Sequence, residues 1–179
     1  MLKNQFKPIL CFVITVLLCS SLFSQQIIKE AGIRFNLNDS LWKRNANQND
    51  HIQNAIIYRY KRTPIETSDG KQVIPNITVV VETVKDSLDI MVFSAMKKIK
   101  TPFDVEEVIT PDKGLLQYQN AIGYRGEYTD RTGIRHSIII IYLINKNKGV
   151  QMVMDITREL YDEYRGEFDD VIRSIVAIN

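Results

Sequence analysis

An uninterrupted apolar run from Ile138 to Ile144 constrains the fold of this chain more than any other feature. It is rich in β-branched isoleucine, which favours a strand, and successive strand residues point to opposite faces of a sheet. A strand that is apolar on both faces needs cover on both faces. The run therefore predicts a central strand in a sheet that is covered from both sides.

Other β-rich segments flank this run and are separated from it by turn residues. Strands joined by short hairpins run antiparallel, and helices can cover the two faces of such a sheet. The sequence predicts an α+β fold, in which an antiparallel sheet of about six to eight strands is sandwiched by helices. The expected strands cover residues 33–37, 41–44, 55–61, 77–84, 104–109, 115–128, 134–144 and 150–156, with a long hairpin loop at 62–75.

Two segments show the spacing of helices. The first follows Asp86 or Ser87, either of which can cap it, and ends at Thr101-Pro102. The second is the C-terminal segment, whose early turns are acidic, as the helix dipole favours. The apolar positions are Leu88, Met91, Val92, Ala95, Met96 and Ile99 in the first, and Leu160, Tyr164, Phe168, Val171, Ile172, Ile175 and Val176 in the second.

The N-terminus has the pattern of a secretory signal peptide over residues 1–24. Lys3 and Lys7 precede an apolar stretch at 8–19, and small residues follow it. We expect cleavage after Ser24, which leaves one α+β domain at 25–179 in the periplasm or outside the cell. Two alternatives stay open: lipidation at Cys19, and an uncleaved signal that tethers the protein to the membrane.

Cleavage at this position changes the chemistry available to the protein. Both cysteines, Cys11 and Cys19, lie within the signal, so the mature chain has no thiol for a disulfide, a metal site or catalysis. It also has 21 basic and 21 acidic residues, because Lys3 and Lys7 are removed. A neutral chain gives no electrostatic reason to expect nucleic acid as a partner, and no membrane span is expected after cleavage.

The sequence offers few candidates for catalysis or metal binding. The chain has two histidines, His51 and His136. His136 and Ser137 are neighbours on an expected strand and so point to opposite faces, which argues against a base and nucleophile pair. Two isolated histidines give no zinc-ligand spacing, and Asp104, Glu106 and Glu107 lack the pattern of a calcium loop. We predict no catalytic, metal-binding or cofactor-binding residues, and no cofactor.

Three further patterns have simple structural interpretations. The acidic residues of the C-terminal helix predict a solvated helix face. The segment 123–126 contains two glycines but not the pattern of a phosphate loop, so a bulge or a close approach is expected there. Tyrosines and arginines on the strands are expected to serve packing rather than to line a groove for a ligand. The residues are Asp162, Glu163, Glu167, Asp169 and Asp170 for the first pattern, and Tyr58, Tyr60, Tyr118, Tyr124, Tyr128, Tyr142, Arg59, Arg125, Arg131 and Arg135 for the last.

Two segments have motifs of a known family: an aromatic strand and turn before Trp42, and a helix end with an aliphatic-Ser-aliphatic tail at Ile172 to Ile175. Together with the order of elements, they resemble the PsbP-like family. Members begin with an aromatic strand and a turn that leads to a tryptophan, matched here by the segment from Phe35 to Trp42, without the usual proline. They end in a helix with an aromatic residue and an aliphatic-Ser-aliphatic tail, matched by the segment from Phe168 to Ile175. The resemblance covers nearly all of the mature chain in element order and implies the fold. It also implies an accessory or binding role rather than a shared active site.

The sequence therefore favours an exported, non-enzymatic accessory or binding protein of the cell envelope, with a protein partner. Two other functions stay open. One is a small secreted hydrolase that uses carboxylates brought together by folding. The other is a carrier that holds an apolar ligand between sheet and helix.

Overall fold

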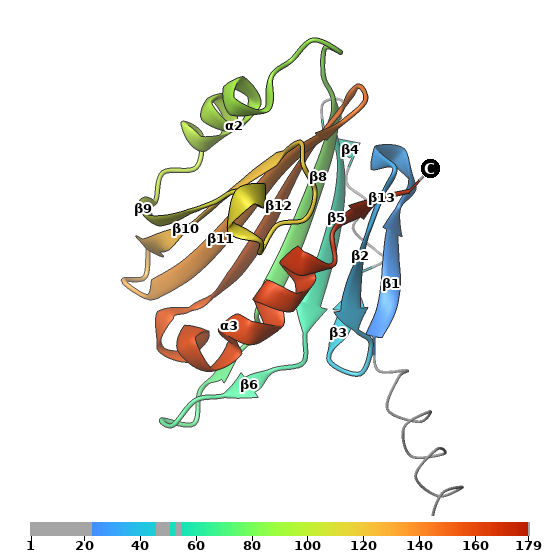
Figure 1. Ribbon diagram of the computed structural model, residues 1–179. Helices are drawn as coiled ribbons and strands as arrows, with labels where there is room; N and C mark the ends of the chain where they lie inside the picture. The colour runs from blue at the N-terminus through green and yellow to red at the C-terminus, as the bar shows by residue number, and fades with distance from the viewer. Residues whose placement is uncertain (1–22, 46–50, 53–54, 179) are drawn as a thin grey trace, which may run out of the picture.

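The structure is a computed structural model that describes residues 23–45, 51–52 and 55–178 (Figure 1). Most of the expected signal peptide, including Cys19, lies outside the described residues. The first described strand, β1 (Phe23–Ile28), begins just before the expected cleavage position after Ser24.

The main sheet is antiparallel throughout and confirms the predicted fold class. Its strand order is β3-β5-β8-β12-β11-β10-β9, and β4 pairs with β5 beside this path. Four strands of the main sheet precede the helix α2 (Ile90–Lys98) in the chain: β3 (Trp42–Arg44), β4 (His51–Ile52), β5 (Ala55–Arg62) and β8 (Asn76–Thr83). Those that follow it are β9 (Asp104–Ile109), β10 (Ala121–Thr129), β11 (Arg135–Asn145) and β12 (Lys148–Thr157).

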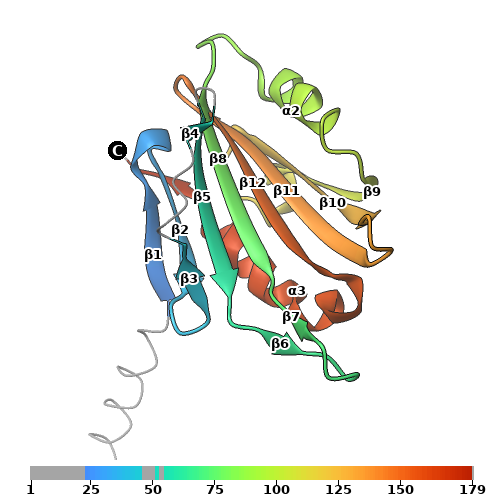
Figure 2. The ribbon, with the colours of Figure 1, turned by 180° about the vertical axis from the view of Figure 1, so that it is seen from behind.

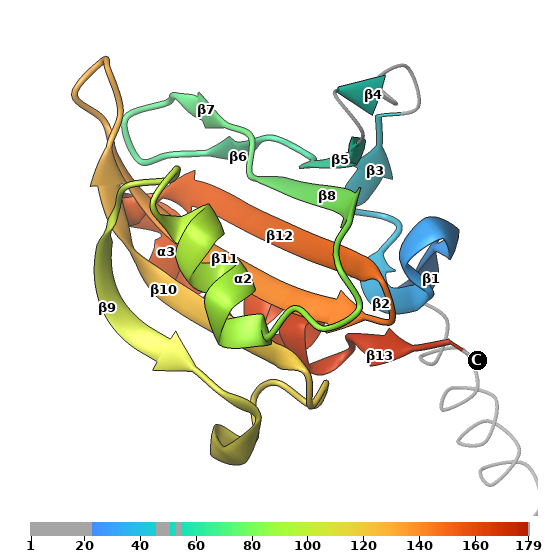
Figure 3. The same ribbon diagram turned by 90° about the horizontal axis from the view of Figure 1, so that it is seen from above.

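The apolar run lies in β11, with β10 on one side and β12 on the other. Ile139, Ile141 and Leu143 join a hydrophobic cluster on one face of the sheet, while Ile140 and Tyr142 join a second cluster on the other face. A helix lies on each face: α3 (Arg158–Arg173) is in front of the sheet in Figure 1 and behind it in Figure 2, and α2 (Ile90–Lys98) covers the opposite face (Figure 3).

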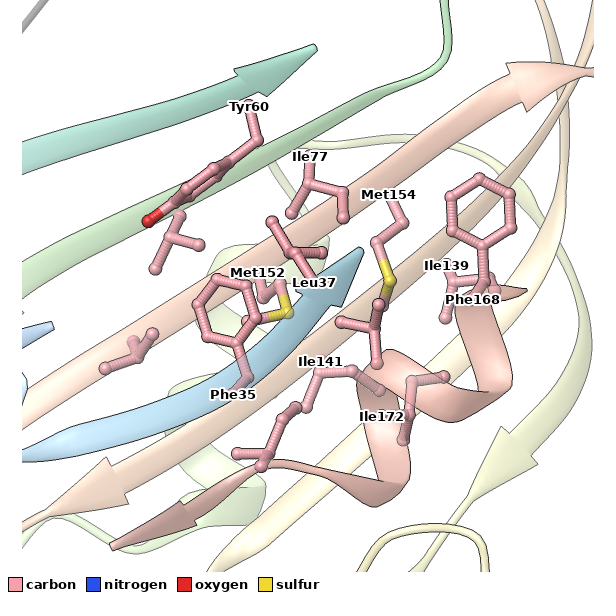
Figure 4. Close-up of a cluster of buried hydrophobic side chains, with 14 of the residues drawn as sticks. Phe35, Leu37, Tyr60, Ile77, Ile139, Ile141, Met152, Met154, Phe168 and Ile172 are labelled. Carbon is pink, nitrogen blue, oxygen red and sulfur yellow. The ribbon is translucent and has the colours of Figure 1, made fainter. Parts of the chain in front are cut away.

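Helix α3 packs in the expected way, with its apolar stripe toward the sheet. Leu160, Phe168, Val171 and Ile172 are all buried. Figure 4 shows Phe168 and Ile172 beside Ile139, Ile141 and the two methionines of β12, Met152 and Met154.

Smaller elements extend the core on the α3 side. A three-stranded antiparallel sheet places β2 (Ile33–Asn38) between β1 and β13 (Val176–Ala177), and Phe35 and Leu37 of β2 enter the same cluster (Figure 4). The expected long loop contains a two-stranded hairpin of β6 (Ile65–Glu66) and β7 (Gln72–Val73). Two short 3-10 helices are η2 (Lys29–Ala31) and η3 (Pro111–Lys113).

Helix α2 differs from the sequence prediction at its start. It begins at Ile90 rather than after Asp86 or Ser87, because Asp89 is the N-cap. The Asp89 carboxylate accepts hydrogen bonds from the backbone N–H groups of Met91, at 2.8 Å, and Val92, at 3.3 Å. These bonds satisfy N–H groups that have no partner within the helix.

Helix α2 also packs with an unexpected side. Phe93 and Ser94 are its buried residues. The Phe93 ring packs on Gly149 of β12 so closely that a Cβ at position 149 would lie 2.7 Å from ring atom Cζ. Five of the six apolar positions whose spacing predicts the helix instead face solvent: Met91, Val92, Ala95, Met96 and Ile99.

Candidate functional site

A groove of about 720 Å³ lies at the end of the main sheet where β8 begins and β12 ends. We call it the rim groove. One wall is the segment around β7, a second is the start of β11 with the loop before it, and the floor is the junction of β12 and α3. The side chains used below are Lys71, Val73, Ile74, Asp130, Ile134, Arg135, His136, Asp155 and Arg158.

His136 lies between two carboxylates in this groove. Its Nδ1 is 2.9 Å from an oxygen of Asp155 on β12, and its Nε2 is 3.6 Å from an oxygen of Asp130 in the β10–β11 loop. The ring stacks on Tyr128, with centroids 5.0 Å apart, and the Tyr128 hydroxyl donates a 2.7 Å hydrogen bond to Asp155. Four side chains from three strands and one loop thus form one polar cluster.

The surroundings shift the pKa of two members of this cluster, Asp130 and Tyr128. Thr132 and the backbone N–H of Ile134 donate to Asp130, and these bonds lower the pKa of the Asp130 carboxyl. Burial, followed by the hydrogen bond to Asp155, raises the pKa of Tyr128. The Tyr128 hydroxyl is therefore neutral and remains a hydrogen-bond donor at physiological pH.

The cationic side chains of the groove have carboxylate partners elsewhere. Lys71 pairs with Asp69 at 2.6 Å, and Arg135 pairs with Glu127. Arg158 pairs with the same Glu127, and also with Asp162 of its own helix at 3.0 Å. Within the described part of the chain, His136 is the only basic partner recorded for Asp130 and for Asp155. The cluster therefore carries negative charge that the arginines and Lys71 do not neutralise directly.

This arrangement does not match the acid–base machinery of the hydrolase alternative. A general acid at neutral pH needs a carboxyl with a raised pKa, whereas the pKa of Asp130 is lowered. Both oxygens of Asp155 already accept hydrogen bonds, from His136 and Tyr128. The two ring nitrogens of His136 point to different carboxylates, and no three metal-ligating side chains among the described residues form a group that could hold a metal ion.

The other sequence candidates do not converge on this cluster. Ser137 is buried on the opposite face of the sheet from His136, as strand alternation predicts. The backbone of His51 lies in β4, and its side chain is outside the described residues.

The strand tyrosines and arginines lie in separate places. Tyr58 and Tyr60 pack in the α3-side cluster, while Tyr124 and Tyr142 pack in the α2-side cluster. These four tyrosines serve packing, as expected, whereas Tyr128 stacks on His136 and Arg135 lines the rim groove, so the expectation fails for those two residues.

The prediction of a solvated acidic face on the C-terminal helix is wrong in part. Asp162, Glu163 and Asp170 are exposed. Glu167, however, accepts hydrogen bonds from Trp42 and Arg62, and Asp169 accepts one of 2.5 Å from the buried Arg125. These two acids join α3 to the strands.

The segment 123–126 contains the bulge and the close approach that the sequence predicts. A Cβ at Gly126 would lie 1.9 Å from the carbonyl oxygen of Asp104 on the neighbouring strand β9. The register between β9 and β10 shifts at this point, so a bulge and a close approach occur together.

The sequence did not predict the His136 cluster, although it did predict the hairpin that brings Tyr128 next to His136. The expected strands 115–128 and 134–144 leave a short connection between them, and the hairpin around it pairs Tyr128 with His136. Asp155 comes from a separate hairpin, so its approach depends on the register between β11 and β12.

Among the described residues, a small pocket of about 220 Å³ lies beside α3, with Leu37, Trp42 and Val171 in its lining. It is smaller than the roughly 300–1,000 Å³ typical of ligand pockets, which does not favour the carrier alternative. Directly between the main sheet and α3, the space is filled by Phe168, Val171 and Ile172 packed on the strands. On the α2 side Phe93 meets Tyr142 edge-to-face, with ring centroids 6.0 Å apart. Neither helix in the described part of the chain is long and apolar enough to cross a membrane.

Comparisons with known proteins identify the fold. No protein-family model and no curated protein matches this chain. The solution structure of cyanobacterial PsbP (CyanoP) from Synechocystis sp. PCC 6803 aligns with a TM-score of 0.56 at 10% identity, over 88% of this chain and 93% of that chain. The Ran-binding protein Mog1p of Saccharomyces cerevisiae aligns with a TM-score of 0.53 at 10% identity, over 88% and 96%.

A structure from Bacteroides thetaiotaomicron aligns with a TM-score of 0.53 at 9% identity, over 88% of this chain but only 49% of that longer chain. At these identities the likeness concerns the backbone arrangement and not the side chains of a site. The chain therefore has a Mog1/PsbP-like fold, which confirms the resemblance seen in its sequence.

Proposed function

We propose that this protein is an exported, non-enzymatic binding protein of the cell envelope, whose rim groove holds a basic side chain of a protein partner. One observation carries the proposal: Asp130 and Asp155 lie in the groove, and His136 is the only basic partner recorded for them among the described residues. A lysine or arginine of a partner would supply the missing positive charge.

The walls of the groove fit the stem of such a side chain. Val73, Ile74 and Ile134 line it, and Ile74 and Ile134 are each 49% exposed. Lysine and arginine bury their apolar stems while the charged end stays polar. A groove that is apolar along its walls and anionic near His136 matches both parts of these side chains.

Two further observations support the wider role. The N-terminal pattern of basic, apolar and small residues supports export. A yeast protein with the same fold is described as Ran-binding, which supports binding as a role that this fold can serve.

Binding can be tested by calorimetry and by NMR chemical-shift changes, with blocked tripeptides Ala-Lys-Ala and Ala-Arg-Ala as probes. We expect shifts for His136 and Ile134, and about 10-fold weaker binding after Asp155→Asn, since hydrogen bonds to charged groups contribute about 1.5–3 kcal/mol. Asp170→Asn is the matched control, because Asp170 is an exposed acid that lies outside the rim groove.

The free diamine cadaverine distinguishes a small amine from a peptide side chain. Binding of cadaverine without binding of either tripeptide would replace the protein partner with a small-molecule ligand. Absence of groove shifts with all three probes at 10 mM, a concentration that half-saturates a site with a Kd of about 10 mM, would overturn the proposal.

A further inference from the structure

Helix α2 presents a continuous apolar surface to solvent. Its residues, which we call the α2 outer face, are Met91, Val92, Ala95, Met96 and Ile99. At 100° per residue they span an arc of about 140° on the helix. The exposed fractions are 56% for Met91, 49% for Val92, 57% for Met96 and 82% for Ile99. Contiguous apolar surface of this kind marks interaction sites.

The protein's own core does not use this face. The opposite side of α2 holds the helix on the sheet through Phe93 and Ser94, and the Ser94 hydroxyl lies 3.3 Å from the hydroxyl of Tyr124. Lys97 pairs with Glu82 at 2.5 Å, and the Lys98 ammonium lies 4.7 Å from the centre of the Tyr124 ring. Figure 3 shows α2 lying across the sheet, with one side turned away from it.

The charges at the two ends of the helix have opposite sign. Asp86 and Asp89 are exposed at the N-terminal end, where the exposed Lys85 offsets part of their charge and leaves the end acidic. Lys97 and Lys98 lie in the last turn, and the exposed Lys100 follows it. Between the two ends, the small Ala95 occupies the middle of the α2 outer face.

The charges along α2 complement those of a second copy of α2 that runs in the opposite direction. If two copies of α2 meet antiparallel, the lysine end of each lies against the aspartate end of the other, and the two helix dipoles oppose each other favourably. The small side chain of Ala95 at the crossing point allows the helices to approach closely. A two-fold axis there closes the assembly as a dimer.

Pairing through the nearest sheet edge is a less suitable route. The edge strand β9 is acidic, and its residues opposite β10 skip from Val105 to Glu107, which leaves Glu106 as an extra, bulged residue. Bulges and like charges on an edge strand oppose the addition of a further strand.

We propose that a second copy of this chain covers the α2 outer face, forming a two-fold dimer through antiparallel α2 helices. This interface is separate from the rim groove, so the dimer and the binding of basic side chains can fail independently.

Sedimentation velocity on the protein as purified after export, with the N-terminus that cellular processing leaves, tests the dimer. We expect a dimer for the wild type and about 100-fold weaker association for Met96→Glu, because the two-fold axis places this charge in the interface twice. Val108→Glu is the matched control: Val108 is 37% exposed on β9 and should leave association unchanged.

A charge exchange tests the antiparallel arrangement itself. Lys100→Asp and Asp86→Lys should each weaken association several-fold, because each variant places like charges at both ends of the interface. An equimolar mixture of the two variants restores both opposite-charge contacts and should recover wild-type association. Failure of the mixture to recover would overturn the antiparallel dimer.

Two other results would overturn the proposal. One is a wild-type protein that stays monomeric up to about 1 mM, the concentration at which even weak association is seen. The other is a monomer that binds vesicles of phosphatidylethanolamine and phosphatidylglycerol and loses that binding with Met96→Glu. That result would assign the face to a lipid surface.

Discussion

The two helices that cover the main sheet place their apolar residues in opposite ways. Helix α3 is 16 residues long and buries Leu160, Phe168, Val171 and Ile172 against the strands. Helix α2 is nine residues long and buries Phe93 and Ser94, while its longest apolar stripe faces solvent. Both helices pack on the same sheet, so the sheet does not account for the difference. Helix α3 buries its apolar residues in the core, whereas α2 leaves most of its apolar residues exposed to solvent.

Polar contacts strengthen this difference. On the α3 side, Arg125 is 3% exposed and pairs at 2.5 Å with both Glu107 of β9 and Asp169 of α3, joining the sheet edge to the helix. On the α2 side, the lysines of the helix pair with the half-exposed Glu82 and with an aromatic ring. We therefore expect the α3 side to dominate the free energy of unfolding.

The largest expected effect comes from truncating the α3 core. Phe168→Ala should lower the free energy of unfolding by about 4 kcal/mol, through lost burial and the cavity left behind. Ile99→Ala, on the α2 outer face, should change it by about 0.5 kcal/mol or less when the protein is monomeric. Urea denaturation of both variants measures the contrast. Equal losses of unfolding free energy in the two variants would show that the α3 side does not contribute more to stability than the α2 outer face.

The next largest loss of stability is expected from removing Arg125, which forms ion pairs with Glu107 and Asp169. Arg125→Met should cost about 3 kcal/mol, because it leaves the half-buried Asp169 without its closest cation. Arg165 lies 3.7 Å from Asp169 and limits the loss. Thermal unfolding is the measurement, with Arg173→Met, which removes an exposed pair on the same helix, as the control. A loss no larger than that of the control would contradict a structural role for Arg125.

A smaller loss of stability is expected from a substitution that weakens the contact between α2 and the sheet. Gly149→Ala places a methyl group against the Phe93 ring and should destabilise the protein by about 2 kcal/mol through overpacking. Hydrogen exchange should show faster opening of α2 amides than of α3 amides. A uniform change across both helices would show that α2 does not open as a separate unit.

The smallest effect is a dependence on pH at the rim groove. The pKa of Asp130 is lowered in the folded protein from 3.8, so its contribution to stability is present above that value and is lost as the pH falls through the lower folded value. Melting temperatures of the wild type and Asp130→Asn should differ at pH 6 and converge toward pH 3. A constant difference across this range would exclude the Asp130 contribution.

Much of the fold could be predicted from the sequence because the signals are local. The run at 138–144 required cover on both faces, and β11 is covered on both faces. The short connection between the expected strands 115–128 and 134–144 required a hairpin, and Tyr128 pairs with His136 across it. Both helices are present where the spacing predicts them. However, α2 begins at Ile90 because Asp89 supplies the cap, and α3 ends at Arg173, so that Val176 lies in β13 instead.

The candidate site could not be predicted because it depends on long-range register. His136 and Asp155 meet only when β11 and β12 pair in one register, and a slip by one residue would turn each side chain to the other face. Glu167 and Asp169 show the same limit, since their partners Trp42, Arg62 and Arg125 lie on distant strands.

The sequence by itself determined the α+β class, the antiparallel sheet and the need for two covering layers, because periodicity and turn residues act over a few neighbouring positions. Only the tertiary structure decided which side of α2 is buried. Spacing at three and four residues makes a helix amphipathic, but the side that packs is chosen by shape, and here the Phe93 ring fits the space above Gly149. The stripe that predicts the helix is thereby left facing solvent.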